Sequence, residues 1–418
     1  MTDKRIMRKA FFASLLMLFV CNMQAQEQIR VWKEGNSKRF TTSEVSFSED
    51  GSTFSVVDST YDCAQIDSIT VVHTITVTFA GDTAYVDYGH ATNVTDTIQG
   101  AHVKLNSTNT KSELEFVLQG ESTHGSFTYD GPLKCKFYLN GLNLKSDQGA
   151  AIDIKCGKRI DFILNPGTDN FLADAANGDQ KAALHCKGHL EISGSGNLTI
   201  TGNAKHGIDT KEYLEIKKST GNITIKKAMG DGMHIGQYFL MNGGNVSITG
   251  QKGDGIQIET MTIITESNDT IPNPDKEFNG QMFYNGGKLY IKAYEDCTKG
   301  IKVPGDMTVT GDTLRVEAVG DGSKGISVSG NVLINKDTSY PLVQVRCLGD
   351  TWEDEEEKED DVYCCGIKIK GNFIVDHGHV QVTKTNRYQY PIRLSKNSVY
   401  VHDNDDAIVE GSVSHTQK

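Results

Sequence analysis

Carboxylates that recur at one position of a repeated phrase are the strongest chemical signal in this 418-residue sequence. The tripeptide Gly-Asp-Gly occurs at 230–232 and again at 253–255, so Asp231 and Asp254 occupy equivalent places in consecutive repeats. If the repeats stack as neighbouring strands, the two carboxylates lie about 4.8 Å apart. Like charges at that distance repel unless a cation or a proton lies between them. Calcium, a hard ion with oxygen ligands, is the expected ion outside the cytoplasm, so we predict that Asp231 and Asp254 share one.

Three further aspartates extend this candidate metal site. Asp209 lies one repeat before Asp231, and Asp296 and Asp321 form a second pair of equivalent positions. We expect them to supply oxygen ligands as well. The alternative is a ladder of solvated charges in which Asp254 pairs with Lys299 and no ion is bound.

Lysines follow the aspartates along the same row of the repeats. Lys299 and Lys324 take the place that Asp254 has one repeat earlier, and Lys302 points outward from the same strand. The row thus changes from acidic to basic, and lysines beside a bound cation suit the carboxylates of a uronate polysaccharide. An ordinary solvated sheet face is the competing interpretation.

Aromatic residues mark a second row. His189, Tyr213 and Tyr238 share one outward position on neighbouring repeats. Stacked tyrosines can offer an apolar platform to sugar rings. Packing of the same rings on a neighbouring loop is an equally good interpretation.

The repeat that positions these residues is clearest between residues 182 and 258. Leu184, Ile208, Met233 and Ile256 open successive repeats, at steps of 24, 25 and 23 residues. Each repeat holds three short apolar–polar–apolar strands, and no single repeat can bury its own apolar face. Strands this short without helical periodicity predict an all-β fold, a right-handed parallel β-helix with coils of about 24 residues.

The same register extends on both sides of that core. The first-strand residue recurs at Ile152, Ile301, Ile326, Ile367 and Ile392. The third strand recurs too, and we expect Val399–Val401 to be its last copy. The longer steps, 256 to 301 and 326 to 367, predict one coil plus an insertion each.

The chain divides into three parts by pattern. Residues 1–25 combine basic residues with a short apolar run and predict a secretory signal peptide, with a lipid anchor at Cys21 as the less favoured option. Residues 26–72 predict a small N-terminal β module that covers the first coil. Residues 73–418 predict the β-helix, with loop insertions near 262–285 and 335–363.

Removal of Cys21 leaves eight cysteines, which we expect to be mostly a ladder of buried thiols. A disulfide between Cys347 and the Cys364-Cys365 pair is the alternative. The formal net charge of −12 argues against nucleic-acid binding. The sequence contains no transmembrane-length apolar run after the leader, no Ser/His/Asp triad signature, no phosphate-binding or dinucleotide fingerprint and no HExxH zinc motif.

A family resemblance rests on several phrases in order. They are FYLNGLNLKSDQGAAIDIKCGKRIDFILNPGTDNFLAD, KAALHCKGHLEISGSGNLTITG, KHGID and the twin GDG. Together they resemble the secreted bacterial carbohydrate-binding β-helix family, whose fold is similar to that of calcium-dependent pectate lyases. The likeness covers roughly residues 74–418, and the segment before it resembles leaders common on secreted Bacteroidetes proteins. It implies bound calcium and an acidic or cellulosic polysaccharide ligand.

Two departures separate the chain from a lyase: no clustered Asp-Asp pair occurs in the coils, and no arginine lies beside the aspartate ladder. We therefore expect a non-catalytic polysaccharide-binding protein. The rival is a calcium-dependent lyase with Lys299 or Lys324 as its base. A third possibility is a surface adhesin or structural rod without a sugar ligand. Oligomeric state is open.

Overall fold

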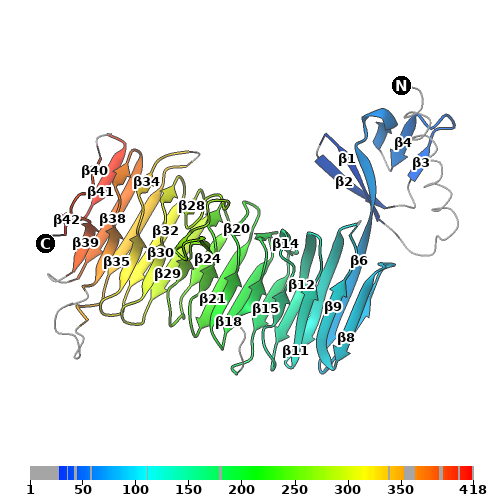
Figure 1. The fold of residues 1–418 in the computed structure, drawn as a ribbon, viewed down its shortest axis with the longest axis horizontal. Helices are drawn as coiled ribbons and strands as arrows, with labels where there is room; N and C mark the ends of the chain where they lie inside the picture. Colours follow the sequence, from blue (N-terminus) through cyan, green and yellow to red (C-terminus); the bar gives the residue numbers. More distant parts are fainter. Residues whose placement is uncertain are drawn as a thin grey trace.

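The structure is a computed structural model that describes residues 28–34, 36–41, 45–56, 59–110, 112–177, 181–337, 339–352, 363–385, 389–402 and 405–416. The expected signal peptide, residues 1–25, and the acidic stretch 353–362 lie outside the described residues. The described chain is almost entirely β, with one 3-10 turn, η2 (Cys63–Gln65). Most of it winds into a parallel β-helix that forms an elongated stack of coils (Figure 1). The predicted fold class is confirmed.

The first-strand row forms one sheet of 13 strands, in which β8 (Val94–Gln99) pairs antiparallel and closes one edge. The residues predicted to open each repeat pair directly, from Ile152 with Leu184 through to Ile367 with Ile392. The parallel strands are β9 (Ala101–Ser107), β11 (Gly125–Asp130), β13 (Ile152–Ile154), β16 (Ala182–Cys186), β19 (His206–Thr210), β22 (Met233–Ile235), β25 (Ile256–Ile258), β30 (Lys299–Val303), β33 (Lys324–Val328), β36 (Cys365–Ile369), β39 (Tyr390–Leu394) and β42 (Val413–His415).

Two further rows complete each coil. The second-strand row comprises β14 (Ile160–Leu164), β17 (Leu190–Ser193), β20 (Leu214–Ile216), β23 (Phe239–Met241), β28 (Met282–Tyr284), β31 (Met307–Val309), β34 (Val332–Ile334), β37 (Phe373–Val375) and β40 (Tyr400–Val401). The third-strand row comprises β15 (Asp169–Ala173), β18 (Asn197–Gly202), β21 (Asn222–Ala228), β24 (Asn245–Ile248), β29 (Lys288–Ala293), β32 (Thr313–Ala318), β35 (Leu342–Cys347), β38 (Gly378–Lys384) and β41 (Ala407–Glu410). The long strands β10 (Leu114–Ser122) and β12 (Cys135–Lys145) span both rows in the early coils.

One row assignment from the sequence is wrong. Val401 pairs with Ile374 of β37, so β40 belongs to the second-strand row. The last third strand is β41, where Val409 pairs with Val380. Both rows share the same apolar–polar–apolar pattern, so the pattern alone does not tell them apart.

The alternation of inward and outward side chains along each strand forms the core. In each short strand the two flanking residues are buried and the middle one points outward, as in β22, β25 and β28. The inward side chains form one continuous apolar core that runs from Ile75 to Ala407. Cys135, Cys156 and Cys186 are buried free thiols as expected, and Cys347, Cys364 and Cys365 are free thiols as well.

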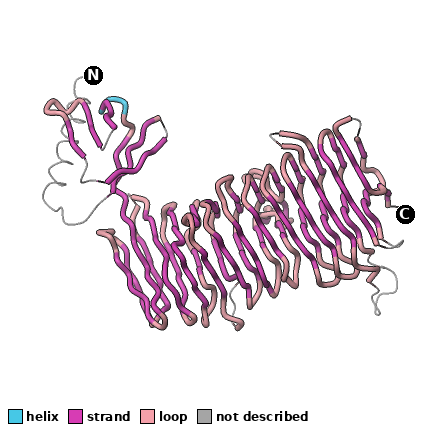
Figure 2. The backbone as a smooth tube through the Cα atoms, turned by 180° about the vertical axis from the view of Figure 1, so that it is seen from behind, coloured by secondary structure: helices cyan, strands magenta, loops and turns pink. Residues whose placement is uncertain are grey.

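The N-terminal β unit stands at one end of the β-helix (Figures 1 and 2). It contains β1 (Gln28–Lys33), β2 (Asn36–Thr41), β3 (Val45–Phe47), β4 (Thr53–Val56) and β5 (Ser59–Asp62). The strand β6 (Ser68–Ala80) joins the two parts, because its first residues pair with β1 and its later ones pair with β10 and with β7 (Thr83–Asp87). Arg30 and Arg39 both contact the buried carboxylate of Glu115 on β10.

The two longer coils differ. Between β25 and β28 the chain leaves the coil as a hairpin of β26 (Thr262–Ile264) and β27 (Thr270–Pro272). Within the second predicted insertion, 335–363, residues Leu342–Cys347 instead form the regular third strand β35.

Among the described residues, no helix is long and apolar enough to cross a membrane.

Candidate functional site

The aspartates of the first-strand row bond to the backbone of the next coil. Asp231 Oδ1 accepts a hydrogen bond from the N–H of Asp254 at 2.8 Å, and Asp254 Oδ1 accepts one from Lys299 at 2.7 Å. Asp296 repeats the pattern with the N–H of Asp321, at 2.8 Å. Each carboxylate therefore satisfies a backbone donor of its neighbour, which already gives these stacked aspartates a structural role.

The Gly-Asp-Gly phrase makes room for this arrangement. A Cβ on Gly253 would lie 2.4 Å from Asp231 Oδ1, and a Cβ on Gly230 would lie 3.2 Å from His206 Nδ1. Gly253 is thus required by the close approach of the Asp231 side chain, whereas a Cβ on Gly230 would only be tightly packed.

Imidazoles surround Asp231. His206 Nδ1 lies 3.2 Å and His234 Nδ1 2.9 Å from Asp231 Oδ2. Burial alone raises the pKa of Asp231, but the two histidines outweigh it and hold that pKa well below its usual value. For Asp254, burial is the largest effect and raises the pKa.

Asp209 is more deeply buried than its neighbours, with 1% of its surface exposed. His185 Nε2 lies 3.4 Å and Lys211 Nζ 3.3 Å from Asp209 Oδ2. Calcium takes six to eight oxygen ligands, whereas the groups around Asp209 and Asp231 include imidazoles and an ammonium. The exposed Asp296 and the half-buried Asp321 carry no such neighbours among the described ion pairs. Asp296 and Asp321 therefore suit an oxygen-binding ion such as calcium better than Asp209 and Asp231 do.

The lysines line a hollow over β30, β33 and β36 of the first-strand row. It has a volume of about 220 Å³, and its charged lining comes from Lys299, Lys302, Lys368 and Lys370. Lys302 and Lys368 lie on alternate coils, with Ser327 paired between them. In the described part of the chain, none of the four forms an ion pair with a carboxylate. A concentrated cationic hollow in an acidic protein favours an anionic ligand.

Lys324 is not part of that exposed lining, contrary to our expectation that it lies on the surface. Only 8% of it is exposed, and its ammonium donates to the carbonyl of Gly322. Burial, followed by the charge of Lys368, lowers the pKa of Lys324 to about 8. The register placed it correctly beside Lys299, but its burial depends on neighbouring coils that the register does not describe.

The predicted aromatic row is assembled. Tyr213 and Tyr238 stack with ring centroids 4.7 Å apart, and His189 stacks on Tyr213 at 4.4 Å. The ring faces therefore cover one another and leave mainly edges outward. Phe278 and Phe283 close the end of the stack edge-on.

Phe278 is the residue of this cluster that the sequence did not reveal. Its side chain is 49% exposed, and its φ of 53° places a bulky residue in the left-handed region. Such strain often marks a functional position. It lies outside the coil period, in the loop after the hairpin, so no repeat pattern could single it out.

The aromatic cluster and the lysine hollow lie on neighbouring coils. The N–H of Gly280, two residues after Phe278, bonds to the carbonyl of Gln237, and the carbonyl of Gly280 accepts from Gly305. Gln237 precedes Tyr238 and Gly305 follows Pro304, which lines the hollow. The loop after the hairpin thus connects the two surfaces.

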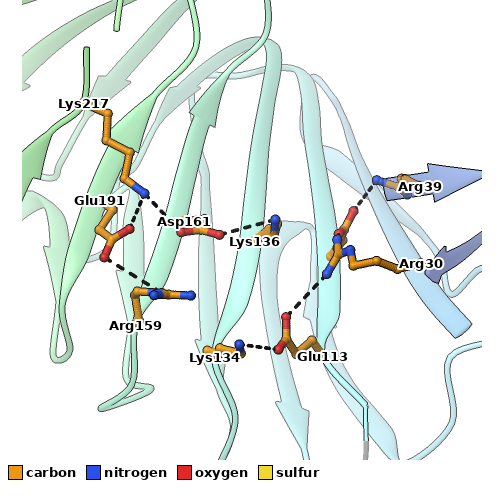
Figure 3. Close-up of polar contacts among 10 residues, drawn as sticks. Arg30, Arg39, Glu113, Lys134, Lys136, Arg159, Asp161, Glu191 and Lys217 are labelled. Carbon is orange, nitrogen blue, oxygen red and sulfur yellow. Dashed lines mark hydrogen bonds and ion pairs between the residues drawn. The ribbon is translucent and has the colours of Figure 1, made fainter. Parts of the chain in front are cut away.

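A charged network occupies the second-strand row beside the aromatic cluster. Figure 3 shows Glu191 between Arg159 and Lys217, with Asp161 between Lys217 and Lys136. The hydroxyl of Tyr213 donates to Glu191 Oε1 at 2.6 Å. Burial raises the pKa of Glu191, but Lys217 and Tyr213 outweigh it and hold that pKa below its ordinary value.

Glu191→Gln should lower the free energy of unfolding at pH 7 by about 1.5–3 kcal/mol, the range for a hydrogen bond to a charged group. A depressed carboxyl pKa stabilises the fold above the unfolded-state pKa and loses that effect as pH falls through the folded pKa. The deficit should therefore shrink as pH falls below the ordinary glutamate pKa of about 4.3, as measured by urea unfolding.

Glu215→Gln is the matched control for this prediction. Glu215 pairs with Glu191 in register, but burial and the charge of Glu191 raise its pKa. Its ionisation costs stability once pH rises through the folded pKa, so the glutamine variant should be as stable as the parent at pH 7, or more so. A similar loss of unfolding free energy in both variants would contradict the conclusion that the ionised Glu191 stabilises the fold.

Comparison with known proteins identifies the family of the β-helix. The model of the family described as carbohydrate-binding domain-containing protein matches residues 99–407. A protein of that description from Acetivibrio thermocellus is 33% identical over 96 residues, which are 21% of this chain and 33% of the relative, so the match spans about a third of that relative's length. The polysaccharide lyase-like protein from C. thermocellum, solved as a gadolinium derivative, aligns with a TM-score of 0.46 at 22% identity, over 65% of this chain and 96% of the other. Since the family model covers most of the β-helix, the chain belongs to the carbohydrate-binding domain-containing protein family.

Proposed function

We propose that this protein binds an acidic polysaccharide of the uronate class outside the cytoplasm, without cleaving it. The observation that carries the proposal is the hollow lined by Lys299, Lys302, Lys368 and Lys370, which have no carboxylate partner among the described residues. Lysines without a carboxylate partner can pair with the carboxylates of a polyuronate, whereas a neutral glucan offers them no charge.

The neighbouring surface supports an extended ligand. Coils repeat about every 4.8 Å along the β-helix, so a polymer laid across the hollow passes from Lys302 and Lys368 toward the loop that carries Phe278. The half-exposed ring of Phe278 offers an apolar face to a sugar ring. Carboxylate contacts and ring stacking together give an acidic sugar polymer two kinds of contact.

Calcium binding and secretion remain predictions. We propose calcium at Asp296 and Asp321, where one oxygen of Asp296 already accepts a backbone hydrogen bond and the surroundings are open to solvent. An ion there would need further oxygen ligands from water or from the polysaccharide.

Binding of the unmodified protein to polygalacturonate, compared with a neutral β-glucan, tests the proposal. Isothermal titration at low and high salt should show binding to the polyuronate that weakens as salt rises, because exposed ion pairs are screened. Equal affinity for the neutral glucan, or affinity independent of salt, would exclude the lysine hollow as the site. Titrations with calcium and with chelator separate the calcium prediction from the binding proposal.

A calcium-dependent lyase is the second candidate, with Lys299 as its base, because Lys299 lines the hollow. A lyase base must lie within reach of the substrate proton, and Lys324 is buried with its ammonium donating to the carbonyl of Gly322. Absorbance of an unsaturated product after incubation with polygalacturonate would establish turnover. Binding without that product supports the non-catalytic proposal.

A further inference from the structure

Two consecutive coils carry mirrored phrases in the first-strand row. Residues 206–209 read His-Gly-Ile-Asp and residues 231–234 read Asp-Gly-Met-His. Ile208 pairs with Met233 and Asp209 with His234, so His206 stacks on Asp231 in the same register. Each histidine therefore shares a register position with a carboxylate of the adjacent coil, and His206 and His234 both lie beside Asp231.

Three of the four side chains converge. Nitrogen atoms of His206 and His234 and a carboxylate oxygen of Asp231 all lie within 4.8 Å of one another. The nitrogens Nδ1 of His206 and His234 are 3.2 Å and 2.9 Å from Asp231 Oδ2, and the imidazole rings stack with centroids 4.4 Å apart. His206 and Asp231 are buried, while the side chain of His234 is 20% exposed.

We propose that His206, Asp231 and His234 bind a first-row transition-metal ion, with Zn²⁺ as the representative. Imidazole nitrogen suits zinc and its neighbours, whereas calcium prefers an all-oxygen shell. For metal–ligand bonds of 2.0–2.1 Å, the edge of a tetrahedral site is about 3.3 Å. The distances already present to Asp231 Oδ2 are close to that edge, but the two imidazole rings are stacked and must rotate before both can direct a nitrogen lone pair at one ion.

The hydrogen-bond pattern shows what metal binding has to displace. His206 Nδ1 accepts from the N–H of Asp231 at 3.0 Å, so its lone pair can bind an ion only after that hydrogen bond is broken. His234 Nδ1 lies at hydrogen-bond distance from Asp231 Oδ2 and needs only to move its proton to Nε2 to become a ligand. Two imidazoles and one carboxylate leave a fourth position, which the partial exposure of His234 opens to solvent or to an oxygen of a bound molecule.

The test uses the untagged protein after removal of metals with a chelator. Titration with Zn²⁺ against a chromophoric competitor should show one ion per chain, and Zn²⁺ should raise the thermal midpoint by about 2–5 °C by mass action. Co²⁺ in the same site should give the visible absorption of a tetrahedral N/O site. A large excess of Ca²⁺ should leave both signals unchanged.

Three variants locate the site. His206→Gln, His234→Gln and Asp231→Asn should each weaken Zn²⁺ binding more than about tenfold. His234→Gln is the decisive one, because its partly exposed position makes it the least disruptive to folding, and circular dichroism checks that fold. His379→Gln is the control, since His379 also contacts a carboxylate, Glu410 at 3.0 Å, but lies far along the chain.

The control variant should bind Zn²⁺ as the parent does. Absence of stoichiometric Zn²⁺ binding by the parent would overturn the proposal. So would unchanged affinity in a folded His234→Gln protein, or displacement of Zn²⁺ by equimolar Ca²⁺. None of these outcomes depends on polysaccharide binding, so the two proposals fail separately.

Discussion

Replacement of Lys302 and Lys368 together by alanine should weaken binding to polygalacturonate roughly tenfold at low salt, a loss of about 1.4 kcal/mol. Each exposed ion pair contributes about 0.2–1 kcal/mol, so two lysines in one hollow account for an effect of this size. Both side chains line the hollow on alternate coils and make no ion pair among the described residues. The residual binding should also depend less on salt.

Lys218→Ala with Lys226→Ala is the matched control for that experiment. Both lysines are exposed and lie outside the hollow, so this pair removes the same charge from the protein. Thermal midpoints should stay near that of the parent in both double variants. Equal losses of affinity in the two would mean that overall charge, and not the hollow, determines binding. A loss confined to Phe278→Ala would place the ligand at the aromatic cluster alone.

The register of the coils was predictable because the spacing of the inward-facing aliphatic residues determines it. Alternation fixes which residues face the core, and a step of 23–25 residues fixes which of them stack. Every first-strand residue from Ile152 to Ile392 consequently pairs as expected. The strands around residue 400 were misassigned because two rows have identical alternation and differ only in the turns between them.

The side-chain chemistry was predictable only in part. Register placed Asp231 and Asp254 in one row, and it also stacked Tyr213 on Tyr238. It did not show that a carboxylate turns toward the backbone of the next coil, or that His234 reaches back to Asp231 in its own strand. These side-chain orientations depend on rotamers and on the space left by neighbouring glycines. The spacing of residues along the sequence does not reveal either.

A column of glycines explains why the row of ionisable residues is so regular. His206, Asp231, Asp254, Lys299 and Lys324 each precede a glycine. A Cβ on any of these glycines from Gly232 onward would lie 2.3–2.4 Å from a branched core side chain of the third-strand row. The backbone can therefore lie against the core only where a side chain is missing. That fixes the position of the preceding residue on every coil.

Gly255→Ala should destabilise the protein by about 1–3 kcal/mol, the usual cost of overpacking. The new Cβ would lie 2.4 Å from both the carbonyl oxygen of Gly300 and Cγ2 of Ile291. The carbonyl belongs to the next strand of the sheet, so relief requires the coils to separate.

Gly157→Ala is the control, because a Cβ there meets no atom within 4 Å. That variant should lie within about 0.5 kcal/mol of the parent or gain slightly from reduced chain entropy. Urea midpoints compare the two, and equal midpoints would show that the coils yield easily. A larger shift for Gly255→Ala, accompanied by weaker Zn²⁺ and polyuronate binding, would show that close contact between coils holds the whole first-strand row in place.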